Sequence, residues 1–483
     1  MVAVEDASGF AGQADEILTP RTAAEVQQIL ARANRENVPV TLSGAGTGVT
    51  GGRVPASGLL LSLQKFQRLD VHPGFVFAGA GVSLNDLQSA AAATRQFYAP
   101  DPTEWTASVG GSIATNASGS RSFRHGSTRK HVRALTVALM DGSIQTWKRG
   151  QSIDFPVPAL PIPNTTKYTA GYVLQPGMDW VDLFIGSEGT LGVVLEAELQ
   201  LLPAPKDLLS GVIFFPTDAA ALNAVDEWRS IPRLRMLEYF DRHSLDFLRT
   251  KYSEVPANAG AALLVEEEDG DVDAWVDRLP GDDGWFALND QDRERFRRFR
   301  HALPEMVNET MHRRGFLKLG SDFAVPLDRN RDMLAFYHER LQTLDYVIFG
   351  HIGDAHVHVN ILPKSPEEFA QGKRLMTEFA QHAVALGGTV SAEHGLGKRK
   401  ADFLAIQYSP AEIEAMKQVK RRLDPNWLLG QGTLFRRSTF PPASKPAEPT
   451  AASYRPPVPP RSSSASPHPA QSEEFLSPPA PHS

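Results

Sequence analysis

Cysteine is absent from this chain of 483 residues. Its absence excludes disulfide bonds, catalytic thiolates, and zinc or iron–sulfur centres held by cysteine ligands. Any electron acceptor beyond an internal organic cofactor must therefore be a separate molecule.

A basic surplus and long hydrophobic runs are missing too. The formal net charge is -7, so nothing predicts the phosphate neutralisation on which nucleic-acid binding depends. No apolar run is long enough to span a bilayer. The N-terminal residues MVAVEDASGF lack the basic and apolar regions of a secretory signal. We therefore expect a cytoplasmic location, with peripheral association at a membrane left open.

The length exceeds what one hydrophobic core usually organises, so we expect two or more domains. Helical and strand patterns alternate along the first half, which predicts α+β layers. Thr22 and Glu25 form a potential capping box for a helix that continues through Ala33. Strands are predicted at Val38–Leu42, Leu59–Leu63, Val76–Ala80, Val132–Leu139, Leu183–Ile185 and Leu191–Leu202. Residues 438–483 are rich in Pro, Ser and Ala, which predicts a disordered tail; a docking arm is the alternative.

A glycine-rich segment directly follows the strand predicted at Val38–Leu42. Its backbone N–H groups could together bind an anion, as in phosphate loops. The dinucleotide fingerprint G-x-G-x-x-G fits poorly, because its third glycine would fall on Val49 and a loop follows instead of a helix. A tight turn without a ligand remains the alternative. The segment consists of Ser43, Gly44, Ala45, Gly46, Thr47 and Gly48.

Two more segments of small residues follow, at Ser108–Gly119 and at Gly186–Gly192, the latter predicted to lie between strands. Small residues over such lengths cannot form a core by themselves. They suit places where the backbone passes close to a large, flat ligand. Three such segments predict one extended ligand that is contacted along its length.

Four of the 14 histidines fall in two short segments. Tyr346–Gly350 is predicted as a strand, and the turn after it can fold His351 back toward His358. Strand alternation puts His356, His358 and Asn360 on one face. Two imidazoles with a carboxylate and an open position suit zinc or a similar divalent cation. The peptidase motif H-E-x-x-H is absent, and histidines satisfied within a core are the alternative.

The chain resembles the FAD-binding family typified by vanillyl-alcohol oxidase, and within it the D-lactate, glycolate and D-2-hydroxyglutarate dehydrogenase branch. The resemblance covers nearly everything from Pro39 to Gly432. It is carried by PVTLSGAGTGVTGG, DPTEWTASVGGSIATNASG, RHGSTRKHV, LFIGSEGTLGVV, FGHIGDAHVHVN, SAEHGLG and VKRRLDPNWLLGQG. Any one stretch alone is weak evidence, but together and in this order they are specific.

The resemblance implies an α+β fold, with an FAD-binding domain of two subdomains over residues 1–205. A substrate (cap) domain with an antiparallel sheet and helices would span residues 206–437 and return to the flavin at its C-terminal end. Ser43–Gly48 would hold the FAD pyrophosphate, and Val193 would contact the adenine side. The residues implied along the flavin and its ribityl chain are Ser108, Gly110, Gly111, Asn116 and Gly119.

Some members of this family attach FAD covalently. His125 stands where this branch often has tyrosine, but we expect non-covalent FAD. The chain also departs from the branch at Gly430-Gln431-Gly432, where Asn-Pro-Gly is common, so a flavin contact from asparagine is expected to be lost.

The resemblance also assigns roles in the histidine segments. His351, His358 and Glu393 would bind the metal, and His394 would be the general base. Asn360 would contact substrate or flavin. His356 replaces the asparagine common at this position, so it could add or replace a metal ligand.

The implied reaction is the oxidation of a D-2-hydroxy acid of the lactate, glycolate or 2-hydroxyglutarate class. FAD N5 accepts the hydride, and His394, with an unperturbed pKa near ~6.5, accepts the hydroxyl proton. A bound metal lowers the pKa of that hydroxyl. Arg300 and Lys318 are favoured over Arg297 for the substrate carboxylate, and helix-surface charges are the alternative.

Two competing hypotheses remain at this point. One is a metal-dependent hydrolase that uses His351, His358 and Glu393. The other is a non-catalytic flavin-binding subunit, which would not need His394. For the oxidoreductase, the external acceptor could be a quinone, a cytochrome or an electron-transferring flavoprotein, and a homodimer is left open.

Overall fold

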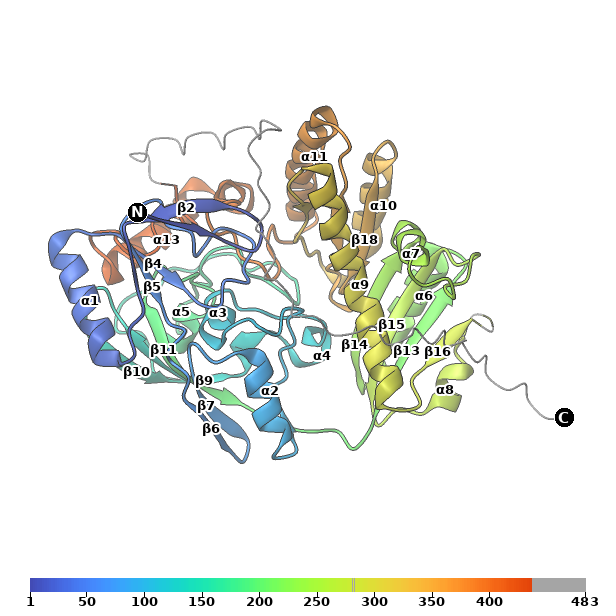
Figure 1. Cartoon of the computed structure of the whole chain (residues 1–483), viewed down its shortest axis with the longest axis horizontal. Coiled ribbons are helices and arrows are strands. Elements are labelled where there is room, and N and C mark those ends of the chain that lie inside the picture. The colour runs from blue at the N-terminus through green and yellow to red at the C-terminus, as the bar shows by residue number, and fades with distance from the viewer. Residues whose placement is uncertain (280, 282, 437–483) are drawn as a thin grey trace, which may run out of the picture.

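The computed structural model describes residues 1–279, 281 and 283–436, arranged as two lobes side by side (Figure 1). The first lobe contains the N-terminal elements, and the second contains most of the chain after residue 207. The helix α13 (Pro410–Leu423) returns the chain to the first lobe. The tail predicted at 438–483 lies outside the described residues.

The first lobe contains two main sheets. A parallel sheet has the order β3-β5-β4, and an antiparallel sheet has the order β10-β9-β11-β7-β6. Helix α1 (Ala23–Glu36) packs Val26 and Leu30 into the core with Leu61 and Leu195, one residue from each sheet. The strands are β3 (Glu16–Leu18), β4 (Val40–Ser43), β5 (Leu59–Ser62), β6 (Leu69–His72), β7 (Phe75–Gly79), β9 (Val132–Ala138), β10 (Ile144–Lys148) and β11 (Val193–Gln200).

Most of the strands predicted in this lobe are confirmed, with ends shifted by one or two residues. The predicted helix start is confirmed as well, since the Thr22 hydroxyl accepts the Glu25 N–H at 3.2 Å. The capping box is wrong in its second bond, because the Glu25 carboxylate accepts from the Arg21 N–H at 2.6 Å instead.

One predicted strand is wrong. Leu183–Ile185 falls mostly within the short helix α5 (Trp180–Phe184), so the Gly186–Gly192 turn joins a helix to β11. Asp179 caps this helix by accepting the Asp182 N–H at 2.8 Å. The helix buries Trp180 and Phe184 on the core side, which is helical spacing.

The second lobe is built on a seven-stranded antiparallel sheet with the order β16-β13-β15-β14-β18-β19-β17. Helices α6, α10 and α11 cover one face, whereas α7 and α9 cover the other. The strand at Tyr346–Gly350 is confirmed as β18, and so is the α+β class. The elements are β13 (Leu208–Phe215), α6 (Asp218–Trp228), β14 (Leu234–Asp241), α7 (Arg242–Arg249), β15 (Ala261–Glu268), β16 (Gly284–Phe286), α9 (Asp290–Arg314), β17 (Leu319–Gly320), α10 (Asn330–Leu341), β18 (Tyr346–Gly350), β19 (His358–Ile361) and α11 (Pro366–Ala385).

Shorter elements complete the two lobes. An N-terminal hairpin docks on the loop after the glycine-rich segment, since the Asp6 carboxylate accepts the Gly51 N–H at 2.7 Å. After α13, Gly430 N–H donates to the Val40 carbonyl at 2.8 Å, which ties the C-terminal segment to β4. The remaining elements are β1 (Val2–Glu5), β2 (Ala11–Ala14), α2 (Leu84–Ala92), β8 (Gln96–Phe97), α3 (Val109–Ala114), α4 (Ser122–His125), β12 (Leu202–Pro203), α8 (Val272–Val276) and α12 (Leu404–Gln407).

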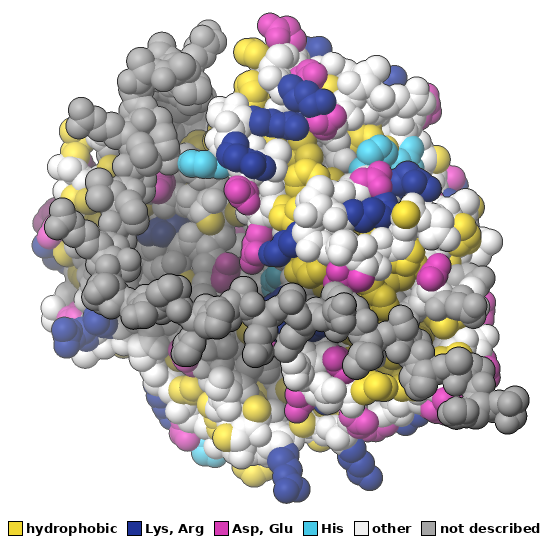
Figure 2. Space-filling view, turned by 45° about the vertical axis from the view of Figure 1, so that its right-hand side comes forward, with side chains coloured by type: hydrophobic (Ala, Val, Ile, Leu, Met, Phe, Trp, Pro, Cys, Tyr) yellow, Lys and Arg dark blue, Asp and Glu magenta, His cyan; other side chains and the backbone are white. Residues whose placement is uncertain are grey.

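The exposed charges are mixed. On the face in Figure 2, basic and acidic side chains are interspersed and form no single basic patch in the part that is coloured. Among the described residues, no helix combines the length and the apolar character needed to cross a membrane.

Candidate active site at the lobe interface

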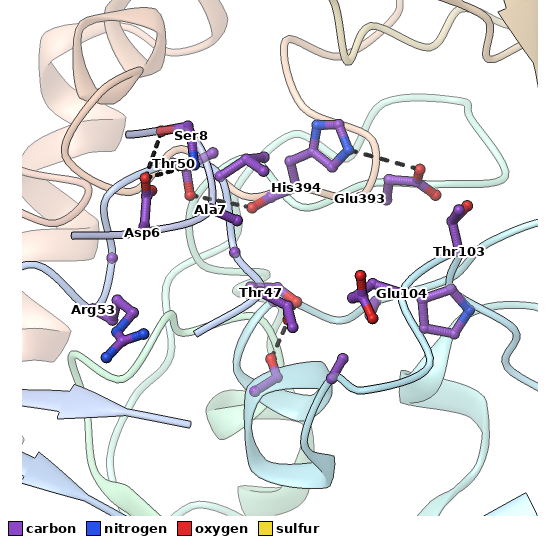
Figure 3. A pocket seen from close by; sticks show the side chains of 18 of the residues that line it. Asp6, Ala7, Ser8, Thr47, Thr50, Arg53, Thr103, Glu104, Glu393 and His394 are labelled. Atoms are coloured by element: carbon purple, nitrogen blue, oxygen red, sulfur yellow. Dashed lines mark hydrogen bonds and ion pairs between the residues drawn. The ribbon is translucent and has the colours of Figure 1, made fainter. Parts of the chain in front are cut away.

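A cavity of about 1050 Å³ lies where the two lobes meet, and we call it the central cavity. Its walls combine the glycine-rich segments of the first lobe with the histidine segments of the second. In Figure 3, Thr47 of the first glycine-rich segment lies across the open space from Glu393 and His394. Segments far apart in sequence therefore share one site.

The wall in the first lobe is made of closely packed backbone. A Cβ atom on Gly44 would lie 2.4 Å from the Ser108 hydroxyl oxygen, and one on Gly110 would lie 2.8 Å from the Ala80 Cβ. Ser108 also caps α3 by accepting the Gly111 N–H at 3.3 Å. We call this wall the backbone cradle. Side chains would fill it, whereas bare backbone leaves its N–H groups accessible and leaves space for an extended ligand.

Nine of the twelve predicted cofactor residues line the central cavity: Ser43, Gly44, Ala45, Gly46, Thr47, Gly48, Ser108, Gly110 and Gly111. Three do not. The Asn116 amide oxygen accepts the Arg129 N–H at 2.9 Å, and the Gly119 N–H donates to Glu393 at 3.2 Å. Val193 is buried in the core, and its neighbours Gly192 and Val194 line the cavity in its place.

The three predicted metal ligands meet at one point. The Nε2 atoms of His351 and His358 lie 3.2 and 3.3 Å from the same Glu393 oxygen, Oε1. Their Nδ1 atoms face acceptors, the Glu238 carboxylate at 2.5 Å and the Ser321 carbonyl at 3.1 Å. Protons on Nδ1 leave both Nε2 lone pairs directed at Glu393, the usual arrangement of metal-binding histidines.

Electrostatics in this cluster also favour a cation. Burial lowers the pKa of His351, but Glu238 and Glu393 outweigh it and raise that pKa to about 9. A positive charge between His351 and Glu393 is therefore stabilised, whether it is a proton or a metal ion. The nitrogen and oxygen donors fit zinc or a similar divalent ion.

His356 lies beside this cluster, and its ligand atom and those of His351, His358 and Glu393 all lie within 4.8 Å of one another. Its ring centroid is 4.5 Å from that of His358, and its Nε2 lies 3.2 Å from Asp322. Burial and His358 lower the pKa of His356 to about 3, so its ring is neutral, as a ligand must be. The structure is thus compatible with the prediction that His356 adds a ligand.

Lys167 was missed by the sequence analysis. It is fully buried, and its Nζ lies 3.1 Å from Glu393 Oε2 and 3.5 Å from Asp354. Burial opposes ionisation of Glu393, but Lys167 and His351 hold its pKa well below the usual value. Lys167 thereby binds one oxygen of Glu393 and leaves the other for the histidines.

His394 stands next to the ligand cluster. Its ring stacks on His358 at 5.4 Å with an interplanar angle of 14°, and a third of its side chain is exposed. Asp322 accepts the His394 backbone N–H at 2.9 Å, and its Oδ1 lies 3.6 Å from the ring Nδ1. Burial lowers the pKa of His394 to about 4, which corrects the unperturbed value assumed from sequence.

The loop that carries His394 is fastened to the first lobe. Glu188, in the third small-residue segment, accepts the backbone N–H groups of Leu396 at 2.8 Å and Gly397 at 2.7 Å. Thr169 accepts the Gly395 N–H at 3.3 Å. Glu188, Glu238 and Asp322 were not predicted, because their partners come from distant segments. Glu188 lies within the third small-residue segment, and Asp322 lies four residues after Lys318.

Arg300 and Lys318, the residues favoured for binding the substrate carboxylate, differ in their surroundings, although both line the central cavity. Arg300 is paired, with Nε and Nη2 each 2.9 Å from Glu238 Oε2. Lys318 has no ion-pair partner in the part of the chain that the structure describes. Arg297 pairs with Glu294 and does not line this cavity, which agrees with the preference for Arg300.

Two further residues singled out from sequence lie apart from the cavity wall. His125 is not among the lining residues, and its Nε2 lies 3.3 Å from Glu268. The Gln431 side chain donates to the Trp427 carbonyl at 2.7 Å, within its own loop. Asn360 does line the cavity, and its buried Nδ2 has no hydrogen-bond partner among the described residues.

Comparison with known proteins agrees with this geometry. Residues 14–148 match the family model of an FAD binding domain, and residues 204–434 match that of the C-terminal domain of FAD linked oxidases. A D-lactate dehydrogenase of Anaerostipes hadrus is 30% identical over 449 residues, covering 87% of this chain and 89% of the relative. A D-2-hydroxyglutarate dehydrogenase of Xanthomonas citri pv. viticola is also 30% identical, covering 88% and 90%.

One solved structure, of an alkyldihydroxyacetonephosphate synthase, has the same fold. It superposes with a TM-score of 0.59 at 15% identity, covering 86% of this chain and 76% of the other. The chain therefore binds FAD and belongs to the FAD-linked oxidase family of oxidoreductases.

Proposed function

We propose that the protein oxidises a D-2-hydroxy acid to the 2-oxo acid, with His394 as the base and a divalent metal at His351, His358 and Glu393. One observation carries the proposal. A neutral imidazole and a three-donor cation cluster face the same cavity as the FAD cradle. The relatives named for D-lactate and D-2-hydroxyglutarate support this class of substrate.

Bound FAD supplies a hydride acceptor at N5. A bound divalent ion supplies a Lewis acid that lowers the pKa of the substrate hydroxyl. The protein's own residues must orient the substrate and take its proton. His394 is neutral at pH 7 because burial lowers its pKa, so it can accept a proton when the hydroxyl is acidified.

Asp322 would assist this transfer. It is fully buried, and its carboxylate lies 3.6 Å from His394 Nδ1. That distance is too long for a strong hydrogen bond, but a buried negative charge there stabilises the imidazolium that forms. Arg300 and Lys318 would supply the positive charge for the substrate carboxylate, with Asn360 as an amide donor.

The two competing hypotheses explain less of the site. A metal-dependent hydrolase has no use for the backbone cradle, and a non-catalytic flavin-binding subunit has no use for His394. Electrons would leave the flavin for a separate acceptor, of the quinone, cytochrome or electron-transferring flavoprotein type, because the chain has no cysteine to hold a metal-sulfur centre.

Anaerobic bleaching of the flavin tests the proposal. The purified yellow protein would be mixed with D- and L-2-hydroxy acids, before and after treatment with a chelator. We expect D-acids to bleach the flavin, chelation to slow bleaching, and His394→Ala to slow it at least 100-fold. His72→Ala, on β6 outside the central cavity, is the matched control. Full-rate bleaching by His394→Ala would remove its role as base.

A further inference from the structure

The N-terminal residues form part of the wall of the central cavity. Strands β1 and β2 pair with each other in a two-stranded sheet, and the chain turns between them. We call residues 5–10 the N-terminal turn, and all but the last of these residues line the central cavity. The N-terminal turn precedes residue 14, where the match to the FAD binding domain begins. It therefore faces the cofactor cavity although it lies outside the matched domain.

Asp6 organises the N-terminal turn and attaches it to the first lobe. Its Oδ1 atom accepts the N–H groups of Ser8 at 2.9 Å and Phe10 at 3.1 Å, both within the turn. Its Oδ2 atom accepts the Gly51 N–H at 2.7 Å, and Gly51 belongs to residues 48–52, which we call the connecting loop. Asp6 is only 6% exposed. Because a buried N–H group that loses its acceptor is costly, removal of this carboxylate would release both the turn and its attachment.

The connecting loop is also joined to the active site. It continues directly from the glycine-rich segment, and the Gly48 carbonyl accepts the Ala7 N–H at 3.1 Å. On its other side, the Thr50 carbonyl accepts the Arg399 N–H at 3.0 Å. The Thr50 hydroxyl donates to the His394 carbonyl at 3.4 Å (Figure 3). The connecting loop thus ties together the N-terminal turn, the glycine-rich segment and the loop that carries His394.

Little apolar packing holds the N-terminal turn in place. Strands β1 and β2 bury Val4 and Ala14 against Leu60, and these three residues form a small core cluster of their own. In the turn itself Phe10 lies over Gly51, since a Cβ atom on Gly51 would be 2.8 Å from Phe10 Cδ1. A two-stranded hairpin with so small a core is only marginally stable. The turn can therefore open locally while the main sheets stay folded.

The N-terminal turn also approaches the second lobe. A Cβ atom on Gly9 would lie 3.9 Å from Leu317 Cδ2, which is ordinary contact distance. Leu317 lines the central cavity and is 49% exposed. The turn therefore lies between the glycine-rich segment of one lobe and the segment before β17 of the other.

We propose that the N-terminal turn is a strap that retains FAD, with Asp6 as its positioning residue. In the closed form Asp6 fixes the connecting loop, and this loop fixes the glycine-rich segment. FAD then dissociates only after the strap opens. The proposal rests on the binding of FAD, which the family membership establishes, and on no step of the proposed oxidation. The strap and the proposed function can therefore fail independently.

The dissociation rate of FAD tests the strap. The full-length FAD-loaded protein would be mixed with excess ADP, which shares one half of FAD and blocks rebinding, and the released flavin would be followed by fluorescence. We expect Asp6→Asn to accelerate dissociation about tenfold, because one carboxylate oxygen is replaced by a donor that faces N–H groups. Phe10→Ala removes only the contact over Gly51 and should accelerate dissociation to a smaller extent. Release of FAD at the unaltered rate by both variants would overturn the proposal.

A loss of overall stability could also release FAD, so two control variants separate these explanations. Val225→Ala creates a cavity in the core beneath α6 and should lower Tm without changing the dissociation rate. Glu16→Gln, at an exposed position of β3 outside the central cavity, should change neither quantity. If Asp6→Asn and Val225→Ala accelerate release in proportion to their loss of Tm, stability explains the effect and the strap is overturned.

Hydrogen exchange of the FAD-loaded proteins locates the change. We expect the amides of the N-terminal turn and the connecting loop to exchange faster in Asp6→Asn than in the unaltered protein. Amides of β9 and β11, in the main antiparallel sheet, should exchange at the unaltered rate. Faster exchange spread evenly over the first lobe would contradict a local opening and overturn the strap.

Discussion

Glu188 offers a sharp test of the electrostatics at the lobe interface. Burial raises its pKa to about 7, even though the N–H groups of Leu396 and Gly397 oppose the shift. In the unfolded chain the pKa is that of an ordinary glutamate. Between those two values the folded protein binds more protons than the unfolded chain, so this group makes stability fall as pH rises.

The expected size follows from the shift. Between pH 5 and pH 8 the contribution of Glu188 to the free energy of unfolding should fall by about 2.5 kcal/mol, since each pKa unit corresponds to about 1.4 kcal/mol. Glu188→Gln cannot titrate and lacks this loss. The variant should therefore gain about 2.5 kcal/mol relative to the unaltered protein over that interval, or about 3 °C in Tm for a chain of this size.

The assay is thermal unfolding of both FAD-loaded proteins at several pH values, with the difference in Tm plotted against pH. Subtracting the Tm of one protein from that of the other cancels the contributions of the titratable groups that both proteins share. Glu36→Gln, at an exposed position in α1, is the control and should give a flat difference. A flat difference for Glu188→Gln as well, or one that favours the unaltered protein at high pH, would refute the assignment.

Three other variants test the cradle and the cation cluster. Gly44→Ala should lower FAD affinity at least tenfold, because its Cβ would lie 2.4 Å from the Ser108 oxygen. Flavin retention after dialysis measures this affinity. Gly281→Ala is the control, because a Cβ there would meet no atom within 4 Å among the described residues. Lys167→Met should lower metal affinity 10- to 100-fold by releasing Glu393, measured by competition with a chelator; unchanged affinity would contradict the role given to Lys167. His356→Asn should lower metal affinity in the same assay if the ring is a ligand, and an unchanged value would exclude it.

The sequence by itself was sufficient for the features that depend on residue type and local backbone. The glycine-rich segments and the strand with His358 and Asn360 were predicted from neighbouring residues, because strand alternation and glycine backbone freedom act over a few positions. The antiparallel sheet of the second lobe was implied by the family resemblance. The lining role of Ser43–Gly48 follows from the same local signals.

Only the tertiary structure decided how the charged groups are paired. Lys167 reaches Glu393, and Glu238 and Asp322 reach His351 and His394, all from distant segments, and no local pattern marks these pairings. The same packing lowers the pKa of His394 to about 4 and neutralises Arg300, while Lys318 has no ion-pair partner among the described residues. The physical reason is that a pKa or an ion pair depends on burial and on whichever charges lie within a few ångströms, and the fold brings those charges together from all parts of the chain.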